Sequence, residues 1–215
     1  MQNWIGILVS YFFIFLIIII AKLFEKIGKE ASRKFIHISL GNWWIIAMSF
    51  FDNVWFASFV PATFVIINYI SCKKDVIKVM ERNEDKKDGY GTVYYAISLL
   101  VLTIVTFGIL NKPILGLIPV FVMAYGDGFA AIFGKAIKSK KYKVYDTEKS
   151  IAGSVTMFIV SFIIICVYLI YIASPLWYIK ALIMGVIITI LEAVAIKGTD
   201  NIIVPIASLV MLMFI

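Results

Sequence analysis

The sequence predicts an all-α fold: a polytopic membrane bundle of about seven to eight transmembrane helices, with its functional site on the cytoplasmic side. Of the 215 residues, 62% are hydrophobic and only 15% are charged, whereas soluble domains are about half apolar and about a quarter charged. The apolar residues gather in runs close to the roughly 20 residues that a helix needs to cross a bilayer. The charged residues gather between these runs. This composition excludes a soluble or a disordered protein.

Eight apolar segments follow one another along the chain, and each is expected to form a helix. The second and the eighth are about 14–15 residues long, so each is expected to be tilted, partly buried or half-crossing. Nothing between the segments is long enough for a soluble domain, so residues 1–215 are interpreted as one membrane catalytic domain. The segments are Trp4–Ala21, His37–Phe51, Val54–Ser71, Tyr90–Leu110, Pro113–Phe133, Ile151–Ala173, Leu176–Ile196 and Ile202–Ile215.

The charged residues predict the orientation of the bundle. Four regions, 22–34, 73–88, 135–149 and 197–200, hold 18 of the 20 Lys and Arg residues. With eight crossings all four lie on one side, and basic loops face the cytoplasm. The net charge of +7 is therefore attributed to loops that meet anionic lipid, and no nucleic-acid partner is expected. Size and the lack of a recognisable targeting sequence favour a prokaryotic plasma membrane.

The first polar cluster borders the second segment. It reads Arg33-Lys34-Phe35-Ile36-His37 and is followed by Gly41-Asn42. Ionisable groups at membrane helices are costly and indicate function. Arg33, His37 and Gly41 are spaced by four residues, so on a helix they share one face. The cluster is either a basic group at the lipid interface or a cationic rim that binds phosphates.

The second cluster is an aspartate between two glycines, in the run Tyr125-Gly126-Asp127-Gly128-Phe129-Ala130, which continues to Gly134-Lys135. The glycines permit an unwound turn and the close approach of a backbone or ligand. Gly126, Ala130 and Gly134 form a stripe of small residues, which is typical of close helix packing. Packing does not account for Asp127, whose carboxylate suits a hard cation such as Mg²⁺.

The third cluster, Glu148-Lys149-Ser150-Ile151-Ala152-Gly153-Ser154, lies where the sixth segment begins. An ammonium, a hydroxyl and backbone N–H groups at a helix N-terminus can bind a phosphate. The alternative is a lysine that reaches the membrane surface beside a serine that caps the helix.

The fourth cluster is Glu192, followed by Asp200-Asn201 and Pro205. Asp200 or Asn201 can cap the eighth segment. Glu192 lies about one turn inside the seventh and needs a partner, for which a metal or a lysine would serve. All four clusters fall on the face that the charge pattern assigns to the cytoplasm. Together they supply carboxylates for a metal and cations for phosphates, the parts of a phosphoryl- or nucleotidyl-transfer site.

The ordered motifs R-K-x-x-H, G-D-G-x-A-x-x-x-G-K, K-S-x-x-G-S and E-A-x(6)-D-N-x-x-x-P, from Arg33 to Pro205, resemble the polytopic CTP-dependent lipid kinases. That family includes dolichol kinase, yeast-type diacylglycerol kinase and plant phytol kinase, and the compact length is most similar to the phytol kinase and prokaryotic branch. The resemblance implies transfer of the CTP γ-phosphate to a membrane-embedded lipid alcohol. The alcohol (phytol, geranylgeraniol, a polyprenol or diacylglycerol) and the oligomeric state stay open.

On this chemistry we expect Asp127 to bind Mg²⁺, with Asp200 or Glu192 as a second carboxylate. Asp127, Glu192 and Lys149 are the expected catalytic residues, and Glu192 orients the lipid hydroxyl. Lys149 and Ser150 would hold the β- and γ-phosphates. The other residues expected to bind nucleotide or phosphate are Arg33, Lys34, His37, Gly126, Gly128, Lys135, Gly153, Ser154 and Asn201.

Two other functions use the same residues. A CTP-dependent phosphatidate cytidylyltransferase needs similar metal and nucleotide chemistry, but its signature, S-x(8)-R-x-x-K-D-x(5)-P, does not occur in the chain. A small ion-coupled transporter would use Asp127 and Glu192 as a proton or ion relay. A transporter predicts carboxylates near the midplane and often an internal repeat, whereas here the carboxylates lie near one face and no clear repeat is found.

Overall fold

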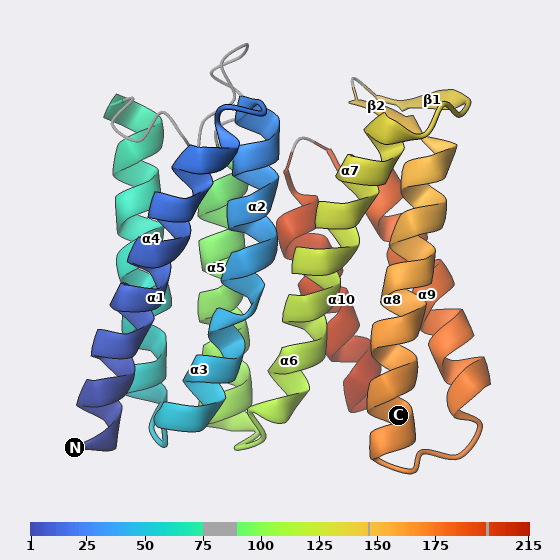
Figure 1. Ribbon diagram of the computed structural model, residues 1–215. Coiled ribbons are helices and arrows are strands. Elements are labelled where there is room, and N and C mark those ends of the chain that lie inside the picture. The colour runs from blue at the N-terminus through green and yellow to red at the C-terminus, as the bar shows by residue number, and fades with distance from the viewer. Residues whose placement is uncertain (75–89, 146, 197) are drawn as a thin grey trace. The chain divides into compact units, whose positions relative to one another are not determined.

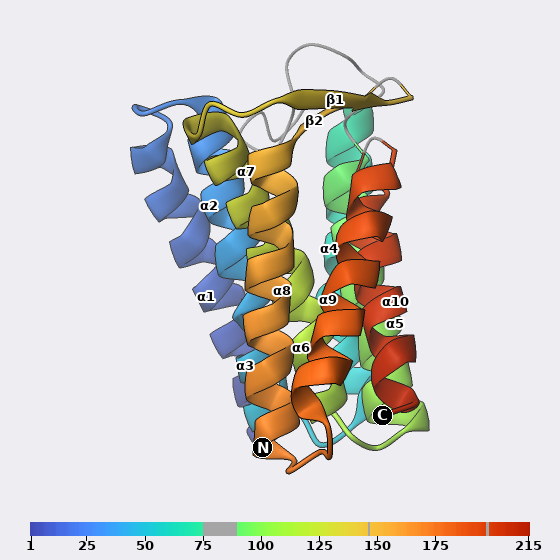
Figure 2. The same cartoon turned by 90° about the vertical axis from the view of Figure 1, so that its right-hand side faces the viewer.

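The computed structural model describes residues 1–74, 90–145, 147–196 and 198–215, and all eight predicted segments form helices (Figures 1 and 2). The chain is a multi-pass integral membrane protein. Among the described residues, six helices are long and apolar enough to cross a membrane: Gln2–Phe24, Val54–Lys73, Gly91–Ile109, Ile114–Ala136, Ile151–Tyr171 and Trp177–Val194. The chain divides into two compact units, Met1–Leu117 and Ile118–Ile215, which are described separately.

The first unit is built around helix α1. Helices α2, α3 and α4 pack against α1, and α5 packs against α4. Two adjacent tryptophans form its core: Trp43 donates a hydrogen bond to Ser10 Oγ (2.9 Å), and Trp44 donates one to the carbonyl of Pro113 (3.0 Å). The elements are α1 (Gln2–Phe24), α2 (Lys29–Gly41), α3 (Trp43–Phe50), α4 (Val54–Lys74), α5 (Gly91–Thr103), a π-helical turn (Ile104–Ile109) and the start of α6 (Ile114–Phe121).

The second predicted segment begins eight residues earlier than the apolar run, because α2 starts at Lys29 and not at His37. The first turns of α2 are polar, so an apolar run does not reveal them. They are held by packing on α1: Ser32 donates a hydrogen bond to the Ala21 carbonyl (2.7 Å), and Phe24 stacks on Phe35 with ring centroids 4.5 Å apart. Residues 29–34, expected in a loop, are therefore helical.

The second unit is built around helix α8, which packs against α7, α9 and the π-helical turn before α7. Its elements are that turn, η3 (Val122–Asp127), then α7 (Gly128–Ala136), β1 (Lys141–Val144), β2 (Thr147–Ser150), α8 (Ile151–Tyr171), α9 (Trp177–Val194) and α10 (Asp200–Met213). The strands β1 and β2 form an antiparallel ribbon in which Tyr142 pairs with Lys149. The prediction of helices alone therefore missed this ribbon, although exposed and half-buried residues alternate along Lys-Tyr-Lys-Val as in a strand.

Successive crossings run in opposite directions, with α2 and α3 together making one crossing, so within each unit the charged regions gather at one end (Figure 1). In the second unit this end carries the C-terminus of α7, the ribbon, the N-terminus of α8, the C-terminus of α9 and the N-terminus of α10 (Figure 2). In the first unit the charged end carries the α1–α2 connection and the end of α4. Region 73–88 lies mostly outside the described residues. The assignment of the charged ends to the cytoplasm stays a prediction from the basic residues.

Candidate active site

Three carboxylates meet at the charged end of the second unit. Asp127 ends η3, Glu192 lies in the last turn of α9, and Asp200 is the first residue of α10. One oxygen from each lies within 4.8 Å of the others. The three residues belong to separate sequence motifs, and the structure brings them together. Acidic groups this close repel one another unless a cation lies among them.

Local backbone geometry directs two of these carboxylates. The wide π-helical turn ends at Asp127, and such turns often mark functional sites. On the α8 side of the same turn, a Cβ on Gly126 would lie only 2.8 Å from Met157 Sδ. The α9–α10 connection turns at Gly198, whose φ of 84° is a left-handed value that favours glycine. Asp200 Oδ1 then accepts a hydrogen bond from the backbone N–H of Asn201 (2.9 Å).

Lys149 is the cation that the structure places beside the cluster. Its ammonium forms an ion pair with Glu192 Oε1 and also donates to the Glu192 carbonyl oxygen (2.6 Å). Both side chains are largely buried, with 14% of Lys149 and 7% of Glu192 exposed. The partner that the sequence analysis required for Glu192 is thus a lysine. A divalent cation among the three carboxylates would reduce the repulsion between them.

The donor set fits Mg²⁺. Mg²⁺ prefers oxygen ligands, uses one or two carboxylates and keeps several waters. Its bond length of about 2.0–2.1 Å places neighbouring oxygens about 3 Å apart, closer than the 4.8 Å that bounds this cluster. Small side-chain rotations or bridging waters would make up the difference. Which of the three carboxylates bind the metal stays a prediction.

The N-terminus of α8 is capped by protein groups. The first three N–H groups of the helix, at 151–153, donate in order to the Lys140 carbonyl (3.0 Å), Ser139 Oγ (3.1 Å) and Ser150 Oγ (3.1 Å). Ser150 is the N-cap, which is the structural alternative that the sequence allowed. The N–H groups at 151–153 therefore already have protein acceptors. A phosphate-binding role for this helix start stays a prediction.

The stripe of small residues serves close packing of α7 on α8. A Cβ on Gly134 would lie 3.2 Å from Gly153 Cα and 2.7 Å from Ser150 Oγ, and a Cβ on Gly153 would lie 3.1 Å from the Ala130 carbonyl oxygen. Ser150 also donates to the Gly134 carbonyl (3.1 Å). This packing fixes the strand that carries Lys149 next to α7.

The other predicted residues of this unit occupy different environments. Gly128 and Asn201 are buried, whereas Lys135 is exposed on the last turn of α7. Ser154 shares a hydrogen bond of 2.5 Å with Tyr142 on the ribbon. Sequence reasoning missed Tyr142 and Ser139, whose positions depend on the unexpected ribbon.

Arg33, Lys34 and His37 belong to the first unit. All three lie on α2, so the predicted helical spacing is confirmed. Arg33 forms a two-bond ion pair with Glu30 (2.7 and 3.1 Å), and Lys34 is buried. The His37 ring contacts Tyr95 edge-on at 4.8 Å between centroids, and Tyr95 donates to the His37 carbonyl (3.2 Å). A role for these cations at the carboxylate cluster stays a prediction.

Curated relatives of the chain are phytol kinases. It is 28% identical to the phytol kinase of Synechocystis sp. over 211 residues, covering 95% of this chain and 89% of the relative. It is 31% identical to the chloroplastic phytol kinase 1 of Arabidopsis thaliana and 29% identical to a probable phytol kinase 1 of Glycine max. Each alignment covers 85% of this chain and 66% of the plant protein. No protein-family model and no solved structure matches the chain.

Proposed function

The chain belongs to the phytol kinase family of polytopic membrane lipid kinases, and from this premise we propose that it transfers the γ-phosphate of CTP to the hydroxyl of a membrane-embedded lipid alcohol. The observation that carries the proposal is the set of three carboxylates within 4.8 Å of one another, paired with a buried lysine. Phosphoryl transfer depends on positioning and on neutralising charge. Such a set supplies both.

Asp127 and Asp200 would hold Mg²⁺, because a carboxylate oxygen of each lies within 4.8 Å of the other and Mg²⁺ is usually bound through one or two carboxylates. A bound Mg²⁺ neutralises charge that builds up on the phosphate oxygens. The two aspartates come from different helices, so binding of the cation would also tie η3 to the start of α10.

Lys149 would contact the transferred phosphate. An ammonium has three N–H donors, and in the described part of the chain two of them go to Glu192. The third can reach a phosphate oxygen. The capped N-terminus of α8 supports a role for this side chain in place of backbone N–H groups.

Glu192 would orient the acceptor hydroxyl at the moment of transfer, since an ionised carboxylate accepts a hydrogen bond from an alcohol. Arg33, Lys34 and His37 would neutralise the phosphate tail of the nucleotide, and a guanidinium is well suited to phosphate oxygens. Ser150, Ser154 and the glycines of the motifs would act by shaping the packing of α7 on α8, as their contacts support.

The test uses purified protein in detergent with Mg²⁺ and γ-labelled CTP. Acceptors are phytol, geranylgeraniol, a polyprenol and diacylglycerol, with phosphatidic acid as the substrate of the rival cytidylyltransferase. The proposal expects label in a lipid monophosphate, and the acceptor that is labelled identifies the alcohol. Asp127→Asn should remove turnover while the protein stays folded. Label released as pyrophosphate with phosphatidic acid, or turnover near wild type in Asp127→Asn, would overturn the proposal.

A further inference from the structure

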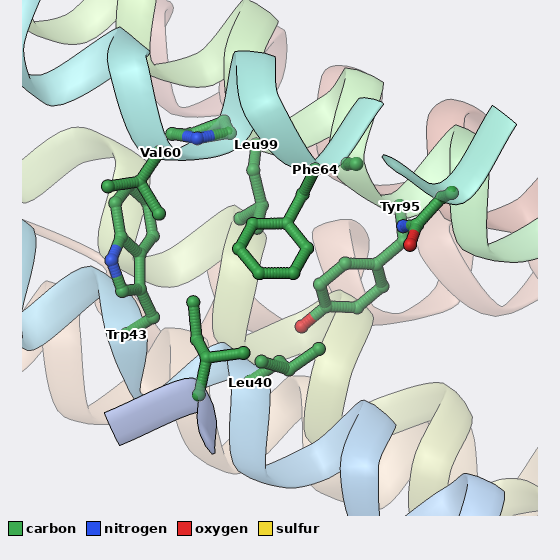
Figure 3. A pocket seen from close by; sticks show the side chains of 10 residues that line it. Leu40, Trp43, Val60, Phe64, Tyr95 and Leu99 are labelled. Atoms are coloured by element: carbon green, nitrogen blue, oxygen red, sulfur yellow. The ribbon is translucent and has the colours of Figure 1, made fainter. Parts of the chain in front are cut away.

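An apolar cavity of about 40 Å³ lies inside the first unit, between α1, α3, α4 and α5 and beside the end of α2 (Figure 3). The side chains of Trp43, Val60, Phe64 and Leu99 converge on it, and Leu40 closes one side. A buried water needs about 10–15 Å³ on this measure. The cavity therefore has room for about three groups of that size, such as the first atoms of a chain.

Among the described residues that line the cavity, Asn68 has the one buried side-chain oxygen or nitrogen without a hydrogen-bond partner. It lies on α4 with 7% of its surface exposed, and its Nδ2 donates to the Thr92 carbonyl (3.0 Å). Its Oδ1 is buried and has no hydrogen-bond partner among the described residues. A buried acceptor in this state is costly, by about 1–3 kcal/mol, and calls for a donor that the structured chain does not supply.

The chemistry of the wall identifies the donor. Buried water usually makes about three hydrogen bonds, but the one hydroxyl among the described lining residues, on Tyr95, already donates to the His37 carbonyl. An alcohol satisfies Asn68 with its O–H and fills the apolar remainder with carbon. A hydrocarbon lacks the donor, and a phosphate monoester would bring charge into an apolar space.

The polar and apolar parts of the cavity wall are also arranged along the helices as a membrane-embedded alcohol requires. Asn68 lies six residues before the end of α4 at Lys74, and its partner Thr92 lies in the first turn of α5. Both are near the charged end of the unit. Val60 and Leu99 line the part farther from that end. An alcohol bound here would place its hydroxyl toward the charged end and its carbon chain toward the bilayer interior.

We propose that this cavity binds the hydroxyl end of the lipid alcohol before transfer, with the O–H donating to Asn68 Oδ1 and the first carbons against Phe64 and Leu99. The choice of ligand rests on the proposed kinase function. The site separates substrate from product, because a phosphorylated alcohol has lost the neutral hydroxyl that Asn68 requires. The cavity has room only for the hydroxyl and the first carbons of the alcohol. The rest of its hydrocarbon tail extends beyond the cavity.

The test is photolabelling of the full-length protein with an alkanol that carries a diazirine on the third carbon from the hydroxyl. Label is expected on Phe64 or Leu99. Excess geranylgeraniol should displace it, and geranylgeranyl monophosphate or an alkane of equal length should not. Asn68→Leu keeps the volume and removes the acceptor, so specific labelling should fall about fivefold, as expected for one hydrogen bond.

Two further variants separate binding from folding. Ala96→Val adds two methyl groups to the cavity wall and should abolish specific labelling while the protein stays folded. Ser58→Ala removes a second buried side-chain oxygen on α4 that has no hydrogen-bond partner among the described residues and lies outside the cavity, and it should leave labelling unchanged. Labelling that is equal in wild type and Ala96→Val, or spread over lipid-facing residues, would overturn the inference. Kinase turnover measured in parallel tests the proposed function separately, because labelling needs no transfer.

Discussion

Removing the ammonium of Lys149 should expose the electrostatic cost of the carboxylate cluster. Glu192 has only 7% of its side chain exposed, and its oxygen lies within 4.8 Å of oxygens of Asp127 and Asp200. Two unit charges at that distance repel by about 3.5 kcal/mol at an effective dielectric constant of about 20. In Lys149→Met this repulsion loses its compensation. Breaking a buried pair by removing one partner costs about 3–5 kcal/mol.

A double-mutant cycle separates this effect from lost packing. Glu192→Gln removes the buried charge and leaves Lys149 with a carbonyl acceptor, so it should be milder than Lys149→Met. The double variant should be more stable than Lys149→Met alone, with a coupling energy of about 2 kcal/mol or more. Lys141→Met is the matched control, since Lys141 pairs with Glu148 on the surface and both side chains are more than 60% exposed. That pair is worth about 0–1 kcal/mol.

Thermal unfolding of the purified protein, followed by intrinsic fluorescence in EDTA and then in Mg²⁺, is the assay. A domain of this size shifts by about 2–4 °C per kcal/mol, so a loss of about 3–5 kcal/mol should lower the melting temperature of Lys149→Met by about 6–20 °C in EDTA. Mg²⁺ should recover more of that loss in Lys149→Met than it adds to wild type. A melting temperature for Lys149→Met equal to that of Lys141→Met, or no coupling with Glu192→Gln, would refute the reasoning.

Three further predictions concern packing, capping and nucleotide binding. Gly134→Ala should lower the stability by about 1–3 kcal/mol in thermal unfolding, because its Cβ would meet Gly153 Cα at 3.2 Å. An unchanged melting temperature would show that α7 can move away from α8 without a loss of stability. Ser150→Ala should cost about 1 kcal/mol as a lost N-cap, measured in the same way. Arg33→Met should raise the KM for CTP about tenfold while the KM for the alcohol stays within twofold, in steady-state assays; an unchanged KM for CTP would exclude Arg33 from the nucleotide site.

The helices could be predicted from sequence because apolar runs of membrane-spanning length leave few alternatives to a helix. The errors fall where the chain is polar. The start of α2 at Lys29 depends on Ser32 and Phe35 packing on α1, and the ribbon depends on strand pairing between Tyr142 and Lys149. The residues that make these contacts do not lie in an apolar run, so the sequence pattern does not reveal them.

The carboxylates of the site could also be predicted, since Asp127 and Glu192 are residue types that membrane helices exclude without a reason. The side chain that pairs with each carboxylate could not be predicted from the sequence. That Lys149 engages Glu192, and that Ser139 caps the N-terminus of α8, follows from how α8, α9 and the ribbon meet. Residue types and spacing thus predicted which carboxylates matter, and tertiary contacts decide which side chains they pair with.

The central claim, that the carboxylates form a divalent-metal centre for phosphoryl transfer, is tested most directly by electron paramagnetic resonance of Mn²⁺ bound to the purified protein. We expect one Mn²⁺ per wild-type chain, displaced by Mg²⁺, with a spectrum that changes when CTP is added. Asp127→Asn and Asp200→Asn should each weaken Mn²⁺ binding about tenfold or more. Wild-type affinity in both variants, or no bound Mn²⁺ in folded wild-type protein with or without CTP, would contradict the account.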